Sequence, residues 1–84
     1  MRLDKYLKVS RLIKRRTVAN EACDGERVSV NGKPAKASYD VKQGDRIEIR
    51  FGAHTLTVEV LQVADNVRKD DAAAMYREVS APAE

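Results

Sequence analysis

The stretch that decides the fold of this chain is residues 2–16, which read RLDKYLKVSRLIKRR. Leu3, Tyr6 and Leu7 are spaced i, i+3 and i+4, and residues at this spacing lie on one face of a helix with about 3.6 residues per turn. We therefore expect a first helix over residues 3–9, with Tyr6 packed in the core, and a basic connection after it.

This stretch is also strongly basic, because it holds seven lysines and arginines and one acid, Asp4. The basic residues are Arg2, Lys5, Lys8, Arg11, Lys14, Arg15 and Arg16. A solvated surface normally mixes both signs, so a run of one sign indicates a surface that binds a polyanion. Lys5 and Lys8 fall on the helix face opposite the apolar residues, which leaves them available for that partner.

A second short helix is expected over residues 18–24. Thr17 is placed to cap its N-terminus, and Val18 and Ala22 stack at the i, i+4 spacing. We expect Gly25 to end this helix in the left-handed conformation, which glycine adopts at little cost. The start of the helix would then add free backbone N–H groups and a positive dipole end beside the basic run.

The period of the apolar residues changes to two after the second helix, which predicts a small antiparallel sheet. Strands are expected over residues 28–30, 46–51 and 55–63. Asn31-Gly32 is the strongest turn signal in the chain and predicts a tight hairpin loop. The apolar residues that share one face of the second strand are Ile47, Ile49 and Phe51.

The end of the chain is expected to form one more helix. Asp70 or Asp71 is placed to cap a short helix over residues 72–79. The predicted fold is therefore α+β: an N-terminal helical hairpin packed on a small antiparallel sheet, with a short C-terminal helix. We expect a single domain over residues 1–80 and a flexible tail over residues 81–84.

Charge is divided unevenly along the 84 residues. Residues 1–42 hold eleven lysines and arginines against five acids, whereas residues 43–84 hold five against eight, so the overall +3 hides a basic first half. The single cysteine, Cys23, has no partner for an internal disulfide, and we expect a small core side chain in a reducing compartment. No secretory segment and no apolar run near the roughly 18 residues of a membrane span is present, so we expect a cytoplasmic protein.

Few residues suit catalysis or metal binding. His54 falls in an expected turn, and no Cys or Ser nucleophile is near it in the sequence. The pair Asp70-Asp71 is explained more simply as a helix start than as a metal site. We therefore expect no enzyme activity, no metal and no cofactor.

RNA binding accounts better for the basic run of residues 2–16. The planar fork of arginine can meet two phosphate oxygens and can stack on an unpaired base. The alternative is that these charges only keep a small domain in solution, and the near absence of acid in the run argues against it. Tyr39 falls in an expected loop, and the sequence does not decide between a structural role and a base-stacking role for its ring. Acidic residues lie near four other basic residues in the sequence and reduce their local positive charge. We therefore expect these four to be ordinary surface residues: Arg50, Arg68, Lys69 and Arg77.

An ordered motif in the first fifty residues resembles the S-four RNA-binding domain, also called the alpha-L motif. Its segments here are residues 2–7, 10–17 and 25–33, followed by Gly44-Asp45 before a strand. The whole chain is similar to the RqcP-type proteins, a family of stand-alone bacterial S-four proteins related to the fifteen-kilodalton heat-shock proteins. The segments that extend this similarity are residues 41–45, 50–52 and 72–76.

The resemblance implies a role in bacterial ribosome quality control. RqcP-type proteins bind large ribosomal subunits that carry an obstructed peptidyl-tRNA, and they support the RqcH-dependent addition of a C-terminal alanine tail to the stalled chain. The implied partners are large-subunit rRNA, the P-site tRNA and RqcH, with no membrane, and the implied location is the ribosome. We expect a monomer. The heat-shock relatives carry a longer basic C-terminal extension, which the acidic second half of this chain does not match.

Carried over by position, the resemblance places Asp4 among the RNA-facing residues. The RNA-facing residues that it implies are Arg2, Lys5, Lys8, Arg11, Lys14, Arg15, Arg16 and Thr17, with Asn31, Lys33 and Lys36 at the edge. A carboxylate repels phosphate, so Asp4 either orients Arg2 or Arg16 or simply begins the first helix. Three other functions stay open: a heat-shock-type recycling factor for obstructed large subunits, an RNA-binding accessory to an RNA-modifying enzyme, and a structural protein of intact ribosomes.

Overall fold

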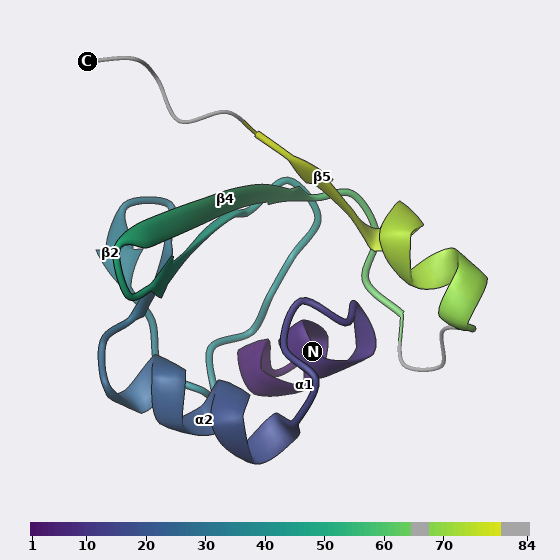
Figure 1. Cartoon of the computed structure of the whole chain (residues 1–84). Helices are drawn as coiled ribbons and strands as arrows, with labels where there is room; N and C mark the ends of the chain where they lie inside the picture. Colours follow the sequence, from purple (N-terminus) through teal and green to yellow (C-terminus); the bar gives the residue numbers. More distant parts are fainter. Residues whose placement is uncertain (65–67, 80–84) are drawn as a thin grey trace.

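The structure is a computed structural model that describes residues 1–64 and 68–79. Within these residues, a helical hairpin covers one face of a five-stranded antiparallel sheet with the strand order β2-β1-β3-β4-β5 (Figure 1). The elements are α1 (Leu3–Val9), α2 (Arg16–Asp24), β1 (Val28–Val30), β2 (Lys33–Pro34), β3 (Arg46–Phe51), β4 (His54–Val60), the 3₁₀ helix η1 (Lys69–Met75) and β5 (Tyr76–Glu78). The predicted α+β architecture is confirmed.

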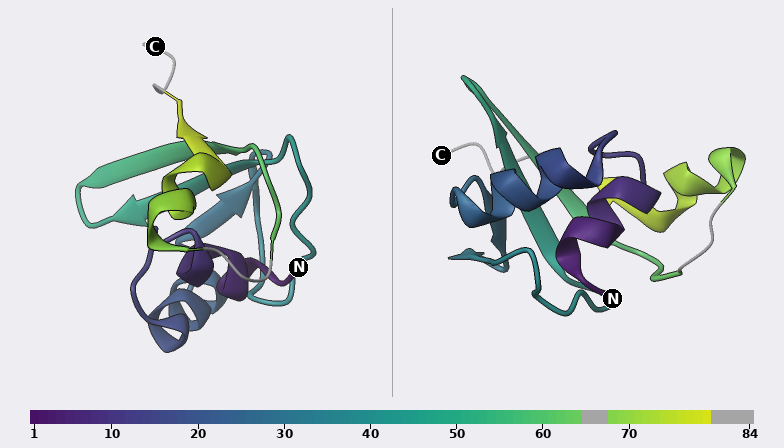
Figure 2. Two further views of the ribbon diagram at one scale, coloured as in Figure 1. Left: turned by 90° about the vertical axis from the view of Figure 1, so that its right-hand side faces the viewer. Right: turned by 90° about the horizontal axis from the view of Figure 1, so that it is seen from below.

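The hydrophobic core lies between the helical hairpin and the sheet. Leu3, Tyr6 and Leu7 of α1 are fully buried, as their helical spacing predicted. Ile47 and Ile49 of β3 close the core from the other side, because alternate residues of a strand point to the same face. Both panels of Figure 2 show the two helices on the same side of the sheet.

The first hairpin of the sheet follows its turn signal. Asn31 and Gly32 both have a positive φ, 53° and 85°, as a tight two-residue hairpin loop requires. Val30 pairs with Lys33 directly across this loop, and β2 forms an edge of the sheet. The strand predicted over residues 55–63 is β4, which starts one residue earlier and ends three residues sooner.

The second helix begins two residues earlier than predicted, and its predicted cap is wrong. Arg15 occupies the N-cap position without a side-chain capping bond, and Thr17 lies inside the first turn. Val18 is 47 % exposed, so it does not join Ala22 in the core. The residues of α2 that are buried instead are Ala19, Ala22 and Cys23. This stripe of small side chains faces α1, and Val18 lies about 100° away from Ala19 around the helix axis.

The end of α2 also corrects an expectation. Gly25 has a φ of −84°, and the left-handed residue is Glu26, with a φ of 62°. A Cβ atom at residue 25 would lie 3.0 Å from the carbonyl oxygen of Glu21, so this position favours glycine because the helix backbone approaches closely. The N–H groups of Glu26 and Arg27 then bond to the carbonyls of Cys23 and Ala22.

The short C-terminal helix predicted over residues 72–79 is present, but its bounds are wrong. The short 3₁₀ helix η1 takes its first half, and Tyr76–Glu78 form β5 against β4, with Val60 opposite Tyr76. Arg68 occupies the N-cap position of η1, so neither Asp70 nor Asp71 caps it. The free edge of β4 gives these residues backbone hydrogen-bond partners. The local sequence pattern does not indicate this strand pairing.

Met75 fastens this C-terminal segment to the core. Its side chain is fully buried, and its carbonyl oxygen accepts hydrogen bonds from the Tyr6 hydroxyl (2.8 Å) and from the N–H groups of Leu61 (2.8 Å) and Gln62 (3.1 Å). The buried phenol of Tyr6 is thereby satisfied, and its pKa is raised by burial. The predicted tail over residues 81–84 lies outside the described residues.

Candidate RNA interface

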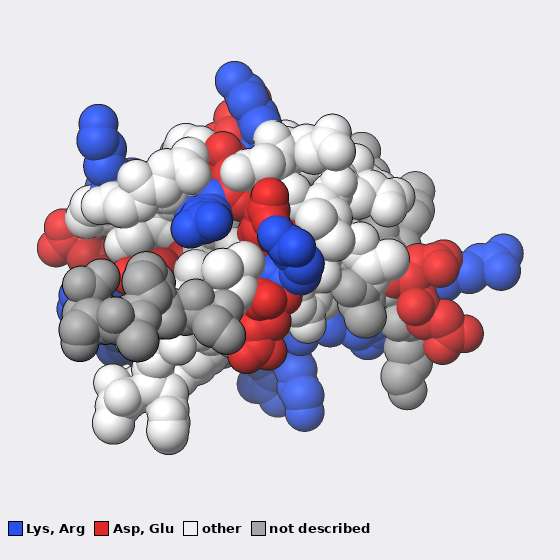
Figure 3. All heavy atoms as spheres, turned by 90° about the horizontal axis from the view of Figure 1, so that it is seen from above, with Lys and Arg blue, Asp and Glu red and all other residues white. Residues whose placement is uncertain are grey.

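The outer face of the sheet, away from the helices, carries charges of both signs. Figure 3 shows basic and acidic side chains interspersed over this face. Arg77 of β5 forms an ion pair with Glu59 of β4, directly opposite it in the sheet, and Arg46 of β3 lies opposite Glu59 on the other side. Such a face neutralises itself and offers little attraction to a polyanion.

The helical hairpin differs, because most of the basic residues of the first half lie on it. We use the name helical basic surface for Arg2, Lys5, Lys8, Arg11, Lys14, Arg15, Arg16 and Thr17. All of these residues are exposed except Lys5, which is partly buried. They belong to the start and outer side of α1, the connection to α2, and the first turn of α2.

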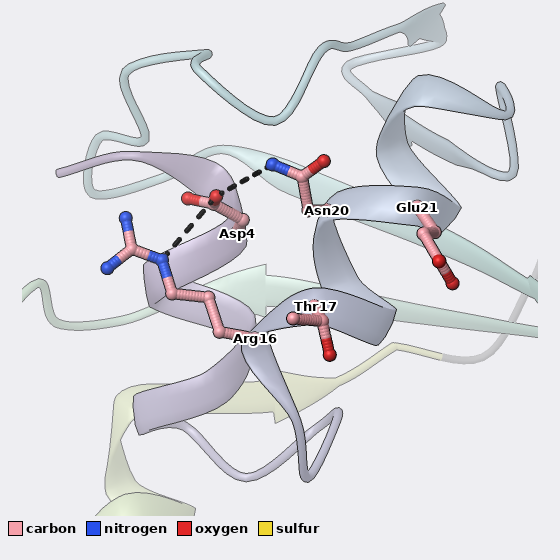
Figure 4. A pocket seen from close by; sticks show the side chains of 5 residues that line it. All are labelled: Asp4, Arg16, Thr17, Asn20 and Glu21. Atoms are coloured by element: carbon pink, nitrogen blue, oxygen red, sulfur yellow. Dashed lines mark hydrogen bonds and ion pairs between the residues drawn. The ribbon is translucent and has the colours of Figure 1, made fainter.

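Asp4 lies at the centre of this surface, with its side chain only 3 % exposed. Its two carboxylate oxygens accept hydrogen bonds from Nε and Nη2 of Arg2, each at 3.2 Å. The Nε of Arg16 is 3.5 Å from Oδ2, and the Nδ2 of Asn20 donates to Oδ2 at 3.3 Å. The backbone N–H of Lys5 completes the set at 2.7 Å. Figure 4 shows Arg16 and Asn20 reaching Asp4 from α2.

These contacts keep Asp4 ionised. Burial alone would raise the pKa of its carboxyl, but the hydrogen bonds from Arg2, Asn20 and the Lys5 N–H, together with the charge of Arg16, outweigh burial and lower the pKa to about 2. The hydrogen bond to the carboxylate in turn raises the pKa of Arg2. At neutral pH the cluster therefore consists of one buried negative charge beneath two positive charges.

The two arginines remain accessible although both contact the carboxylate. The side chain of Arg2 is 51 % exposed and that of Arg16 is 50 % exposed. Their contacts with Asp4 fix the direction of each guanidinium, while N–H groups that do not face the carboxylate can bind phosphate or a base edge. A shallow hollow lies beside them, lined by Asp4, Arg16, Thr17, Asn20 and Glu21 (Figure 4).

Asn20 is the member of this cluster that the sequence analysis missed. It lies one turn after Arg16 on α2, and this i, i+4 spacing places both side chains on the same side of the helix. That spacing was a usable signal, but it pointed to Asp4 only once the two helices were known to pack together. Asp4 itself lies in the first turn of α1, where Arg2 is the N-cap residue.

The connection between the helices is a tight, anchored loop. Ser10 and Ile13 are buried, and the Ser10 hydroxyl donates to the carbonyl of Leu7. Arg11 is exposed and has a positive φ of 65°, a conformation that costs roughly 1–2 kcal/mol in a residue other than glycine. Lys14 is also exposed, so the loop presents its charges outward from a fixed backbone.

The three residues predicted at the edge of the site lie on the β1–β2 hairpin and just after it. Lys33 and Lys36 are exposed, and the backbone beside Lys36 lies next to α1, because the Asp4 N–H donates to the carbonyl of Ala37 at 3.2 Å. The amide of Asn31 is engaged within the chain: it donates to Asp45 (3.1 Å) and accepts from the backbone N–H of residue 46 (3.0 Å). Asn31 therefore holds the hairpin onto β3.

The other residues considered for a functional role are Tyr39, Cys23 and His54. The Tyr39 hydroxyl, open in the sequence analysis, donates to Asp45 at 3.0 Å. Cys23 is buried in the core, as predicted, and burial raises the pKa of its thiol to about 11. His54 is exposed at the start of β4. Within residues 1–64 and 68–79, no three His, Cys, Asp or Glu side chains gather in a group that could hold a metal ion.

None of the helices in the described part of the chain has the length and apolar character that a bilayer-crossing helix needs.

Comparison with known proteins identifies several relatives. Residues 1–47 match the S4 domain. The chain is 59 % identical over 80 residues to the RQC P-site tRNA stabilizing factor of Streptococcus pneumoniae, an alignment that covers 95 % of this chain and 91 % of the relative. It is 58 % identical over 76 residues to the protein of the same name in Bacillus subtilis, covering 90 % and 88 %.

Heat-shock proteins are more distant relatives. Heat shock protein 15 of Escherichia coli is 33 % identical over 81 residues, which cover 95 % of this chain but 61 % of the relative. The structure of Vibrio cholerae Heat Shock Protein 15, described as trimeric, superposes with a TM-score of 0.88 at 34 % identity and covers 95 % of this chain and 82 % of that one. The chain therefore belongs to the S4 domain family, in the group whose members are named RQC P-site tRNA stabilizing factor.

Proposed function

We propose that this chain is a non-catalytic RNA-binding factor of ribosome quality control that holds the P-site tRNA on a split large ribosomal subunit. The observation that carries the proposal is the identity of 59 % to a P-site tRNA stabilizing factor along 91 % of that protein. The helical basic surface supports it, because the cluster of Arg2, Asp4 and Arg16 presents two oriented guanidinium groups to solvent.

The mechanism we propose is positional. Cationic contacts with the RNA backbone fix the placement of a bound RNA without reading its sequence. Lowering the free energy of one placement of the P-site tRNA keeps its reactive end in register for the next step. The contact residues are Arg2, Lys5, Lys8, Arg11, Lys14, Arg15, Arg16 and Thr17, with Asn31, Lys33 and Lys36 at the edge. Asp4 is a positioning residue that orients Arg2 and Arg16.

We also propose the partners of this factor. Large-subunit rRNA is the second RNA that the protein contacts, and the bound peptidyl-tRNA then supports RqcH-dependent alanine tailing of the stalled chain. The protein acts as a monomer in the cytoplasm, associated with the ribosome. The heat-shock-type alternative has less support, since the identity to Escherichia coli Heat shock protein 15 is 33 % and this chain covers 61 % of it.

The direct test is to recover a tagged copy from cells and to examine what accompanies it. We expect large subunits that hold peptidyl-tRNA with alanine-extended chains. Subunits with peptidyl-tRNA but no alanine tails would favour the heat-shock-type function. Recovery of an RNA-modifying enzyme with free RNA, or of intact ribosomes at ribosomal stoichiometry, would overturn the proposal.

A matched pair of variants tests whether recovery of the large subunit depends on the helical basic surface. Arg16→Ala removes an oriented guanidinium from the helical basic surface, whereas Arg77→Ala removes one from the mixed outer face of the sheet. We expect Arg16→Ala to recover much less of the large subunit than Arg77→Ala does. Equal recovery would show that the helical basic surface is not the contact.

A further inference from the structure

The contact between Asn20 and Asp4 fixes the direction in which the Asn20 amide points. Its Nδ2 donates to Oδ2 of Asp4 at 3.3 Å. At neutral pH the Asp4 carboxylate is ionised, and an ionised carboxylate can only accept hydrogen bonds. The amide nitrogen must therefore face Asp4, so the amide oxygen, Oδ1, faces away from it, as Figure 4 shows.

The Oδ1 atom of Asn20 is an acceptor without a partner inside the chain. It accepts no hydrogen bond within residues 1–64 and 68–79, and among these residues no buried side-chain oxygen or nitrogen lacks a partner. Asn20 is itself only partly buried. Oδ1 therefore reaches solvent, in a direction that the bond between Nδ2 and Asp4 holds fixed.

This acceptor lies among groups that mainly donate hydrogen bonds. The lysine and arginine side chains of the helical basic surface carry only N–H donors, and the Thr17 hydroxyl can rotate to donate or to accept. Glu21 is another acceptor that lines the hollow, but its charge repels phosphate, and Figure 4 shows its carboxylate pointing away from Asp4 and Arg16. Oδ1 of Asn20 is thus an uncharged, oriented acceptor beside the guanidinium of Arg16.

The chemistry of RNA favours one partner for such an acceptor. Phosphate oxygens only accept hydrogen bonds, so they can bind the cations but not Oδ1. The 2′-hydroxyl of ribose can donate, and every nucleotide of RNA carries one close to its phosphate. Amino groups can also donate, but they occur on some bases only, and contacts that fix the placement of an RNA through its backbone do not depend on its bases.

We propose that Asn20 recognises ribose: its Oδ1 accepts a hydrogen bond from a 2′-hydroxyl of an RNA whose neighbouring phosphate lies on Arg16. Nε of Arg16 and Nδ2 of Asn20 both lie within 3.5 Å of Oδ2 of Asp4, so the phosphate contact and the ribose contact are adjacent. The inference rests on the proposed RNA-binding function and deepens it. Asn20 distinguishes RNA from a polyanion that offers phosphates alone.

Binding of two RNA probes by the whole chain tests this contact. One probe is a fluorescein-labelled RNA hairpin, and the other has the same sequence with fluorine in place of each 2′-hydroxyl, which keeps the A-form helix and its phosphates but removes the donor. We expect the wild type to prefer the natural hairpin. Asn20→Ala should reduce this preference about fivefold, since the net contribution of one hydrogen bond is lost. Anisotropy titrations measure both affinities.

Two control variants separate the ribose contact from charge and from the loss of any amide. Lys14→Ala should weaken binding of both probes by the same factor, because both carry the same phosphates. Gln43→Ala removes an exposed amide from the loop before β3 and should leave both affinities unchanged. Thermal unfolding establishes that each variant is folded, and the high helix propensity of alanine makes a folded Asn20→Ala variant the expected result.

The outcomes separate this contact from the proposed function. Equal loss of both probes in Asn20→Ala would show that Asn20 acts only by holding Asp4, and would overturn the ribose contact alone. A wild type without a preference for the natural hairpin would also overturn it. A second pair of hairpins with another sequence tests the base edges: a loss in Asn20→Ala that follows the sequence and not the 2′-hydroxyl would assign Oδ1 to a base. A wild-type protein that binds neither probe would overturn the proposed function itself.

Discussion

The helical basic surface and the outer face of the sheet both contain arginines paired with a carboxylate, yet they place the acid differently. Asp4 is buried beneath Arg2 and Arg16, with 3 % of its side chain exposed. Glu59 lies beside Arg77 with 29 % of its side chain exposed. A buried acid orients cations and leaves the outside positive, whereas an acid at the surface cancels the neighbouring cation toward solvent. The position of the acid therefore separates a polyanion-binding face from an ordinary one.

The largest expected effect is the response of RNA binding to salt. If the helical basic surface neutralises about four to six phosphates, log affinity should fall with log salt at a slope of about −3 to −5. Affinity would then fall roughly 60- to 1,000-fold between 50 and 200 mM salt. Fluorescence anisotropy over a salt series measures this slope. An affinity that does not change with salt would show that the helical basic surface does not bind RNA through phosphate contacts.

The next effect compares one arginine from each face. Arg16→Ala removes a charge-assisted contact and should weaken RNA binding roughly 10- to 100-fold. Arg77→Ala removes an arginine whose charge Glu59 already balances, and RNA binding should change less than about twofold. Titrations with the same labelled RNA measure both. Thermal unfolding controls for the fold, and equal losses in the two variants would contradict the assignment of the site.

The two carboxylates differ in their contribution to stability. In the folded protein the pKa of Asp4 is lowered to about 2, below that of an unfolded aspartate, so its contribution is present above about pH 4 and is lost as the pH falls toward 2. Asp4→Asn should lower the free energy of unfolding at pH 7 by about 2 kcal/mol. Urea titrations at pH 7 and pH 3 measure this, and the difference between wild type and variant should shrink at pH 3.

Glu59→Gln is the control for this measurement, because it removes a carboxylate from an exposed pair. The expected change in the free energy of unfolding is below about 0.5 kcal/mol. A loss as large as that of Asp4→Asn would show that burial does not distinguish the two acids.

The smallest effect concerns the edge of the site. Lys36 follows β2 close to the first turn of α1, and Lys36→Ala should weaken RNA binding about threefold. Lys42→Ala removes a charge of the same kind from the loop before β3, where Asp40 offsets it, and should leave binding almost unchanged. Anisotropy at low salt resolves this difference. A larger loss of RNA affinity in Lys42→Ala than in Lys36→Ala would show that the RNA-binding surface extends toward Lys42 instead.

Sequence patterns predicted the elements whose cause is local. The spacing of Leu3, Tyr6 and Leu7 predicted α1 with its bounds, and Asn31-Gly32 predicted the first hairpin, because helical periodicity and positive φ are properties of neighbouring residues. The run of positive charge was equally plain in the sequence.

The wrong predictions are of two kinds. At the ends of α2 the errors are shifts of one or two residues: Arg16 joins the helix, and Glu26 takes the left-handed conformation in place of Gly25. The larger error concerns residues whose state depends on a distant part of the chain. Tyr76–Glu78 became β5 because β4 offered a free edge, although their local pattern favours a helix. Backbone partners from another strand override local propensity here.

By itself, the sequence determined the α+β class, the first helix, the first hairpin and the concentration of positive charge in the first half. Only the tertiary structure decided which charges act together. Packing α2 against α1 brought Arg16 and Asn20 onto Asp4, across more than ten residues of chain, and buried the acid beneath the cations. It also decided that Phe51, which shares one face of its strand with the buried residues Ile47 and Ile49, remains exposed. Burial and long-range pairing depend on how elements pack, and a periodic pattern records only how neighbouring residues alternate.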